Sequence, residues 1–454
     1  MPNPETITLI GAGLNGPLLA IGLVKRGFRV EIYERRPDMR QVRMSAGRSI
    51  NLALSTRGIH ALTQVGLWGE MRKIIIPMKG RMMHSVASEL TFQPYGKDES
   101  EVINSISRAD LNIALMNAAE AQGVKIHFQQ RCTGMDLRTG VLHLRDEQTG
   151  VSTTVRTRLV VGCDGSASAI RNEMLKLNRF NFSQQYLDYG YKELTIPSAP
   201  SGKHVLETHA LHIWPRGNYM LIALPNIDGT FACILFLPFE GGDSFEQLDT
   251  PPAVRKFFRE RFPDAVPLMP DLANNFFSNP LGSMVTIKCS PWHMHDRVLL
   301  LGDAVHAIVP FFGQGINCGF EDCTCFFDLL DRYGENWTNI FAEFEALRKI
   351  NTDAIADLAV QNFVEMRDRV ADPRFLFRKK VELALEAKYP NLFIPKYAMV
   401  TFHRVPYSVA MNRGLLQDKI LSELCSGIHR IEDLDWKKAE QLVHRELTVL
   451  EAAS

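Results

Sequence analysis

The chain lacks several features that would point to whole classes of protein. Its 454 residues carry 51 Lys and Arg against 51 Asp and Glu, so its formal net charge is zero. A balanced charge argues against a general nucleic-acid binder. Its eight cysteines form no CxxC pair and no spacing typical of a disulfide framework, which favours a reducing, cytoplasmic location.

Long apolar runs are also missing. The most apolar stretch, residues 231–239, is too short to span a bilayer, so we expect no transmembrane anchor. Polar and turn residues at the N-terminus lead straight into a strand, unlike a signal peptide. His293 and His295 have no partner ligands at useful spacing, which predicts two surface histidines and no metal site.

The regular elements begin with a βαβ unit. An apolar run predicts a buried strand over Ile7–Ile10, a helix follows over Asn15–Arg26 and ends at Gly27, and a second strand covers Arg29–Tyr33. Further expected elements are a helix over Asp110–Gln122 with Asp110 as its N-cap, strands over Val141–Leu144, Thr153–Val161 and Val298–Leu301, antiparallel strands within Tyr186–Leu237, and helices within Trp337–Val370, Phe375–Ala387 and Arg413–Val449.

Three separated segments, Thr6–Gly16, Leu159–Arg171 and Val298–Asn317, carry nucleotide-binding chemistry. Gly11–Gly16 reads GAGLNG, a G-x-G-x-x-G loop that lets a pyrophosphate approach a helix N-terminus. Glu34 ends the second strand, where an acid accepts hydrogen bonds from a ribose. Asp303 follows another apolar strand and can hold ribityl hydroxyls, and Gly315 opens a helix whose N–H groups can face a flavin. One extended dinucleotide, FAD, explains contacts this far apart.

Each of these residues has a structural alternative. The glycine loop can be a turn without a ligand, Asp303 can be a cap, and Arg108 can be a solvated arginine. No second complete G-x-G-x-x-G loop exists, so a nicotinamide reductant is expected to visit a surface groove and leave.

The three segments together, with Cys163-Asp164-Gly165 as the middle motif, resemble the para-hydroxybenzoate hydroxylase class of FAD-dependent aromatic monooxygenases. The resemblance narrows to the kynurenine 3-monooxygenase family, in its soluble bacterial form, and runs from Thr6 to about Arg404. It rests on the following motifs: GRSINLALS (47–55), RMMHS (81–85), PYG (94–96), QQY (184–186), LHIWPR (211–216), residues 299–322 and FIPKYAMVTF (393–402). Eukaryotic members end in a hydrophobic anchor, whereas this chain ends in amphipathic helices.

The resemblance assigns substrate-carboxylate contacts to Arg81, Tyr95 and Tyr397, and an amide contact to Asn362. These types suit kynurenine, an amino acid whose carboxylate matches an arginine fork. Their alternatives are an ordinary ion pair for Arg81 and core packing for the others. The remaining predicted pocket residues are Phe311, Phe312, His306 and Met366; the predicted cofactor contacts are Gly11, Gly13, Leu14, Asn15, Gly16, Glu34, Arg35, Ala53, Arg108, Cys132, Asp164, Asp303, Gly315, Ile316 and Asn317.

The implied activity is hydroxylation of L-kynurenine to 3-hydroxy-L-kynurenine with NADPH and O2, through a flavin 4a-hydroperoxide. The protein would position the substrate and exclude water, without a catalytic triad. Two alternatives stay open: a related hydroxylase of another aromatic acid, and a flavin-less binding protein like the Rab escort proteins. Oligomeric state is left open, a homodimer being one option.

The expected fold class is α/β: a Rossmann-like FAD-binding domain with a parallel sheet, an inserted antiparallel-sheet substrate domain and a C-terminal helical region. We place the FAD-binding domain at 1–75, 100–178 and 281–372, the substrate domain at 76–99 and 179–280, and the helical domain at 373–454.

Overall fold

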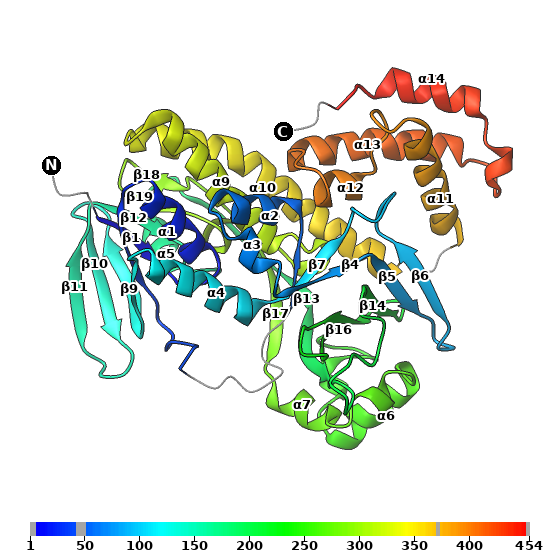
Figure 1. The fold of residues 1–454 in the computed structure, drawn as a ribbon, viewed down its shortest axis with the longest axis horizontal. Helices are drawn as coiled ribbons and strands as arrows, with labels where there is room; N and C mark the ends of the chain where they lie inside the picture. The colour runs from blue at the N-terminus through cyan, green and yellow to red at the C-terminus, as the bar shows by residue number, and fades with distance from the viewer. Residues whose placement is uncertain (1–5, 42–50, 369–372, 451–454) are drawn as a thin grey trace. The chain divides into compact units, whose positions relative to one another are not determined.

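A computed structural model describes residues 6–41, 51–368 and 373–450; for residues 366–368 it describes the backbone alone. The side chain of Met366 and residues 47–50 of the GRSINLALS motif therefore lie outside the described part. The chain divides into two compact units (Figure 1). Unit 1 comprises residues 1–75, 106–187 and 283–356, and unit 2 comprises residues 76–105, 188–282 and 357–454.

The strands of the described residues are β1 (Thr6–Ile10), β2 (Arg29–Tyr33), β3 (Asn51–Leu54), β4 (Ile75–Met78), β5 (Gly80–His84), β6 (Leu90–Pro94), β7 (Ile103–Ser107), β8 (Lys125–His127), β9 (Gln130–Asp136), β10 (Val141–Asp146), β11 (Ser152–Arg156), β12 (Leu159–Gly162), β13 (Asn181–Ile196), β14 (Ala210–Pro215), β15 (Met220–Pro225), β16 (Phe231–Pro238), β17 (Leu281–Ser290), β18 (His293–Met294) and β19 (Val298–Leu300).

The helices of the same residues are α1 (Asn15–Lys25), α2 (Thr56–Gln64), α3 (Trp68–Met71), α4 (Arg108–Ala121), α5 (Ala169–Met174), α6 (Pro251–Arg261), α7 (Leu272–Ser278), α8 (Asp303–His306), α9 (Gly315–Tyr333), α10 (Trp337–Asp368), α11 (Pro373–Lys388), α12 (Lys396–Thr401), α13 (Tyr407–Leu424) and α14 (Trp436–Glu446), with short 3-10 helices η1 (Phe245–Gln247), η2 (Val266–Leu268), η3 (Pro310–Phe312) and η4 (Ile431–Asp433).

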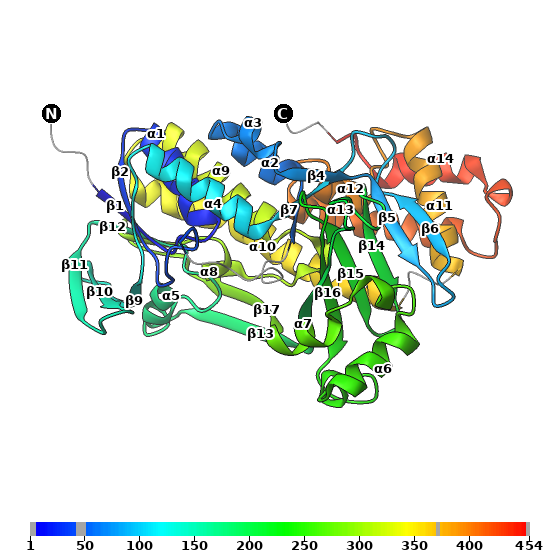
Figure 2. The same cartoon turned by 60° about the horizontal axis from the view of Figure 1, so that its bottom comes forward.

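Unit 1 is built on a sheet of order β18-β19-β12-β1-β2-β8. All neighbours pair in parallel except β18 and β19. Strands β12 and β19 are buried along their whole length, as expected for strands covered on both faces. Helices α1, α4 and α9 lie together on one side of this sheet, and the antiparallel sheet β9–β11 lies on the other (Figure 2).

In unit 2 the main sheet has the order β17-β13-β16-β15-β14-β5-β6. Its pairs are antiparallel where β13, β16, β15 and β14 meet, and parallel between β14 and β5. Aromatic side chains of α6 and α7 pack with the sheet into one hydrophobic core. The C-terminal helices α11, α13 and α14 contribute to a separate core of their own.

The structure confirms the predicted α/β class. It differs from the prediction in three elements: the start of α4, the strand over Thr153–Val161 and the helical region over Arg413–Val449. Helix α4 begins at Arg108, because Ser107 accepts the N–H of Asp110 and is the N-cap in place of Asp110. The single strand predicted over Thr153–Val161 is wrong: β11 pairs with β10, whereas β12 joins the parallel sheet. Thr157 separates them, since its hydroxyl donates to the Leu159 carbonyl and also bonds the hydroxyl of Thr8.

The C-terminal region is helical as expected, but it is not one continuous segment. Helix α13 ends at Leu424, and α14 starts after Asp435, whose carboxylate accepts two backbone N–H groups. Among the described residues, no helix combines the length and apolar character needed to cross a membrane.

Candidate functional site

The three sequence motifs meet at one edge of the unit 1 sheet. Strands β1, β2, β12 and β19 run parallel, so their carboxyl ends share that edge. Gly11 follows β1, Glu34 follows β2, and Asp303 lies shortly after β19. This is where open parallel sheets bind dinucleotides.

The three glycines of the first motif have different structural roles. Gly11 has a φ of 102°, and a Cβ there would lie 2.5 Å from the carbonyl oxygen of Cys163. A Cβ at Gly16 would lie 2.1 Å from the Gly11 oxygen, so both glycines are required by the fold. Nothing lies within 4 Å of a Cβ built at Gly13. The open space at Gly13 is the place where a pyrophosphate can approach the backbone.

Asn15 joins the first motif to the third. A Cβ at Gly302 would lie 2.0 Å from its side-chain nitrogen, and a Cβ at Gly319 would lie 2.5 Å from the same atom. Asn15 therefore fixes the start of α1 against β19 and α9. Its role at the cofactor stays a prediction.

Glu34 is buried and already bonded within the chain. One carboxylate oxygen accepts the backbone N–H of Ala12 at 2.8 Å, and the other accepts the guanidinium of Arg36, also at 2.8 Å. Burial raises the pKa of Glu34, but Arg36 and the backbone donors lower it overall. Arg36 also donates its backbone N–H at 2.9 Å and a second guanidinium nitrogen at 3.4 Å. Glu34 thus stays ionised and holds the glycine loop, and most of its acceptor positions are used within the chain.

Asp164 lies beside Cys132 at the middle motif. One oxygen of Asp164 caps α5 by accepting the N–H of Ala169 at 2.7 Å, whereas the other is buried without a partner among the described residues. Burial raises the pKa of Asp164. Burial and the nearby Asp164 charge raise the pKa of the Cys132 thiol to about 12, so Cys132 stays neutral. A hydroxyl donor from a ligand would satisfy the unpartnered oxygen.

The third motif presents Asp303 to solvent. Its side chain is exposed, at the start of α8 after Gly302, whose φ is 65°. Asn317 in the first turn of α9 is fully buried and clamps the motif: it accepts the N–H of Ser55 and donates to the carbonyls of Ala53 and Gly313. Its amide is thereby used within the chain.

The other predicted cofactor residues lie at or near the ends of strands and helices. Arg35 and Arg108 are exposed, Leu14 precedes α1, and Gly315 and Ile316 open α9. A Cβ at Gly315 would have nothing within 4 Å, the same open space that is found at Gly13.

Unit 2 holds a second cluster, formed by Arg81 of β5, Tyr95 after β6 and Tyr397 of α12. The guanidinium carbon of Arg81 lies 5.4 Å from the ring centre of Tyr95 and 4.9 Å from that of Tyr397. The two phenol rings are stacked, with centres 6.1 Å apart. Two polar atoms here are buried without a partner among the described residues, Nε of Arg81 and the hydroxyl of Tyr95.

The electrostatics of this cluster favour an anion. Burial lowers the pKa of Arg81, but Tyr397, Tyr95 and Glu365 raise it overall, so the guanidinium stays charged. Burial is also the main cause that raises the pKa of Tyr95, so its phenol stays a hydrogen-bond donor. A carboxylate would satisfy both unpartnered donors at once.

The remaining predicted substrate residues divide between the units. Asn362 of α10 is buried in unit 2. Phe311 and Phe312 are buried in η3 of unit 1, before the start of α9. His306 was predicted to line the substrate pocket, but its ring is buried and its Nε2 lies 2.6 Å from Asp322. We therefore assign His306 to the ion network described next.

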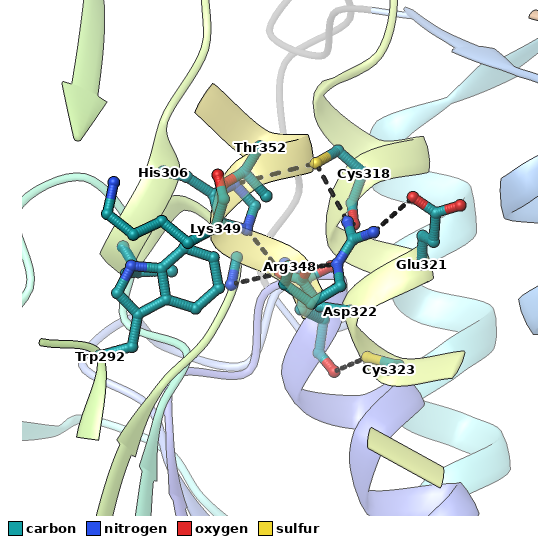
Figure 3. Close-up of polar contacts among 12 residues, drawn as sticks. Trp292, His306, Cys318, Glu321, Asp322, Cys323, Arg348, Lys349 and Thr352 are labelled. Atoms are coloured by element: carbon teal, nitrogen blue, oxygen red, sulfur yellow. Dashed lines mark hydrogen bonds and ion pairs between the residues drawn. The ribbon is translucent and has the colours of Figure 1, made fainter. Parts of the chain in front are cut away.

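Sequence reasoning missed this ion network, in which Asp322 pairs with His306 and Arg348, and Arg348 also pairs with Glu321 (Figure 3). Arg57 pairs with Glu321 as well. Glu321 and Asp322 are consecutive acids in a helix that is otherwise mostly buried, which is an unusual placement. That signal was present in the sequence. Their partners were not identifiable, because they come from three other helices, α2, α8 and α10.

A family model described as an FAD binding domain matches residues 5–331. A kynurenine 3-monooxygenase of Myxococcus xanthus (strain DK1622) is 55% identical over 98% of this chain and 96% of its own length. The kynurenine 3-monooxygenase of Dictyostelium discoideum is 45% identical over 98% of each chain. A solved structure of 2-methyl-3-hydroxypyridine-5-carboxylic acid oxygenase superposes with a TM-score of 0.67 at 21% identity, covering 83% of this chain and 96% of that one.

Fold, motifs and family model together define an FAD-dependent flavoprotein monooxygenase. Identity at this level over nearly the full length narrows the class further. The chain belongs to the kynurenine 3-monooxygenase family.

Proposed function

We propose that this chain hydroxylates L-kynurenine to 3-hydroxy-L-kynurenine, using FAD, NADPH and O2. The observation that carries the proposal is the arginine beside two phenols in unit 2. Arg81 and Tyr95 each keep a buried donor atom without a partner among the described residues. Buried donors of this kind cost free energy unless a ligand pairs with them, about 1–3 kcal/mol each.

The chemistry of the substrate matches this cluster. The carboxylate of an amino acid accepts two parallel hydrogen bonds from a guanidinium, and the Tyr95 phenol adds a third donor. The rings of Tyr95 and Tyr397 lie against the guanidinium and limit its motion. Asn362 offers an amide that can bond the polar groups of the same ligand. These residues bind and orient; none of them needs to act as a base, because the aromatic amine of kynurenine activates its own ring.

The residues of unit 1 fit FAD. Gly13 and Gly315 leave open space beside the backbone, Asp164 keeps an unpartnered buried oxygen, and Asp303 is exposed at the motif edge. When bound, FAD supplies the hydride and oxygen chemistry of the reaction. The chain holds the pyrophosphate near Gly13 and offers the N–H groups of α9 to negative charge.

A hydroxylase of another aromatic acid would use the same unit 1 residues. The carboxylate of such an acid could also pair with Arg81 and Tyr95, so the nearly full-length similarity to kynurenine 3-monooxygenases is what favours kynurenine. We also propose a reducing, cytoplasmic compartment, since all eight cysteines are free thiols.

The test uses the purified full chain. Acid precipitation should release free FAD, and L-kynurenine should accelerate NADPH oxidation and yield a product heavier by one oxygen atom. Anthranilate, which has the aromatic amine but not the amino-acid group, is the matched control and should give neither effect. Colourless protein that cannot be reconstituted with FAD, or equal turnover of the two compounds, would refute the proposal.

A further inference from the structure

The carboxylate of Asp322 is the centre of the buried ion network in unit 1. It is fully buried on α9 and accepts three donors (Figure 3). The backbone N–H of Gly302 lies 3.0 Å away, the Nε2 of His306 lies 2.6 Å away and the Nε of Arg348 lies 2.7 Å away. A buried carboxylate with three charge-assisted or backbone donors is well satisfied.

Two of those donors lie on either side of Asp303. Gly302 precedes it and His306 closes the same short helix, α8. Helix α8 has only four residues and no side-chain cap, so it has little stability of its own. Asp322 therefore ties both ends of the Asp303 segment to α9.

Arg348 extends the network from α10 to the start of α9. Its Nη1 donates to Glu321 at 2.6 Å and its Nη2 donates to the carbonyl of Cys318 at 3.1 Å, in addition to the Asp322 contact. Glu321 also pairs with Arg57 of α2. Only a planar, five-donor side chain can make this set of contacts, because a lysine offers a single nitrogen.

The protonation states fit a network of ion pairs. Burial lowers the pKa of His306, but Asp322 and Cys318 raise it well above its ordinary value of 6.5. Burial raises the pKa of Asp322, whereas His306 and Arg348 lower it overall. Trp292 covers the imidazole, with ring centres 5.5 Å apart. When His306 is protonated, the network holds three cations, His306, Arg348 and Arg57. Its anions are the two carboxylates of Asp322 and Glu321. The excess positive charge lies beside the N-terminal turns of α9.

His306, Cys318 and Asp322 also lie close enough together to suggest a metal site. Arg348 argues against that interpretation. Its guanidinium bonds Asp322 and lies 3.5 Å from the Cys318 sulfur, so positive charge already fills the space a metal ion would need.

We propose that Arg348 and His306 are positioning residues for the flavin site, which act through Asp322. They hold the Asp303 segment and the N-terminal turns of α9 at one fixed spacing. The N–H groups of α9 then form a preorganised positive pole, which stabilises negative charge on the reduced flavin. This inference rests on the proposed flavin function, so the wild-type chain must first be shown to bind FAD.

The test compares Arg348→Lys and His306→Gln with a matched control, Arg26→Lys. Arg26 makes a two-pronged contact with Asp331, 2.6 Å at each prong, in the last turns of the same helix α9. For each variant the dissociation constant of oxidised FAD is measured by fluorescence, and the midpoint potential of the bound flavin by spectroelectrochemistry. The shift of the midpoint potential from that of free FAD gives the ratio of the dissociation constants for reduced and oxidised FAD.

We expect this ratio to rise about two- to thirty-fold in Arg348→Lys and His306→Gln, the range spanned by charge interactions at a helix terminus, and to stay unchanged in Arg26→Lys. An equal rise in all three variants, or no rise in the first two, would show that the network serves the fold alone. If one of the first two does not fold, the other decides; failure of both to fold also rejects the proposal. A wild-type chain that binds no FAD rejects the proposed function instead.

Discussion

Replacing Arg81 should weaken the binding of L-kynurenine and leave the binding of FAD unchanged. The residue belongs to unit 2, whereas the three FAD motifs belong to unit 1. Its Nε is buried without a partner among the described residues, and its guanidinium lies against two phenol rings. The carboxylate of the substrate is therefore the expected partner of the guanidinium.

The magnitude follows from the bonds that would be lost. A hydrogen bond to a charged group contributes about 1.5–3 kcal/mol, which corresponds to about a ten- to hundred-and-fifty-fold change in affinity for Arg81→Ala. Arg81→Lys keeps the charge but loses the planar fork and its contact with the rings, so it should also be impaired, by a smaller factor.

The assay is a double comparison of dissociation constants. L-kynurenine and its decarboxylated analogue are titrated by flavin absorbance against the wild type and Arg81→Ala. The analogue should bind the wild type weakly and lose little more in the variant, because the carboxylate contact is already absent. Arg255→Ala on the exposed face of α6 is the control and should change neither constant. Equal weakening of both ligands by Arg81→Ala would mean that Arg81 shapes the pocket without contacting the carboxylate.

Three further outcomes are expected. Gly13→Val should weaken FAD binding at least ten-fold with unchanged thermal stability of the FAD-free chain, because a Cβ there meets nothing within 4 Å; a matching loss of melting temperature would contradict this. Tyr95→Phe and Asn362→Ala should each raise the KM for kynurenine about two- to twelve-fold with intact FAD content, the effect of about 0.5–1.5 kcal/mol for a neutral hydrogen bond, and unchanged kinetics in both would favour core packing. Burial, with Glu101 adding, raises the pKa of Glu386 to about 7 from its ordinary 4.5, so this group contributes stability that is full below about pH 4.5 and lost as pH rises to about 7. Relative to Glu386→Gln, the wild type should lose melting temperature across that window, and a difference that does not change with pH would refute this.

Local patterns in the sequence were sufficient to predict the strands, helix and motifs at the FAD-binding edge of unit 1. The periodicity of residues 6–33 predicts a strand, a helix and a strand, and the structure has β1, α1 and β2 at almost the same bounds. The glycines and the acids that follow these strands stand at fixed offsets from strand ends. Because parallel strands share an edge, their meeting point follows from the fold class.

The two errors have different causes. Asp110 has the chemistry of an N-cap, but Ser107 lies three residues earlier and caps α4. The run over Thr153–Val161 is uniformly suited to a strand, yet Thr157 bonds Thr8 and breaks it between two sheets. The cap was readable from nearby residues, because Ser107 lies three residues before Asp110. The break at Thr157 was not, because Thr8 lies 149 residues away.

For this protein, the sequence alone determined the α/β class, the FAD motifs and the family, because each depends on short segments whose backbone geometry is set locally. Only the tertiary structure decided that Arg81 lies against two phenol rings and that Asp322 bonds Gly302, His306 and Arg348. Burial is the physical reason. Removing these charged and polar groups from water makes each one require a specific partner, and the partner comes from whichever distant segment the packing brings near.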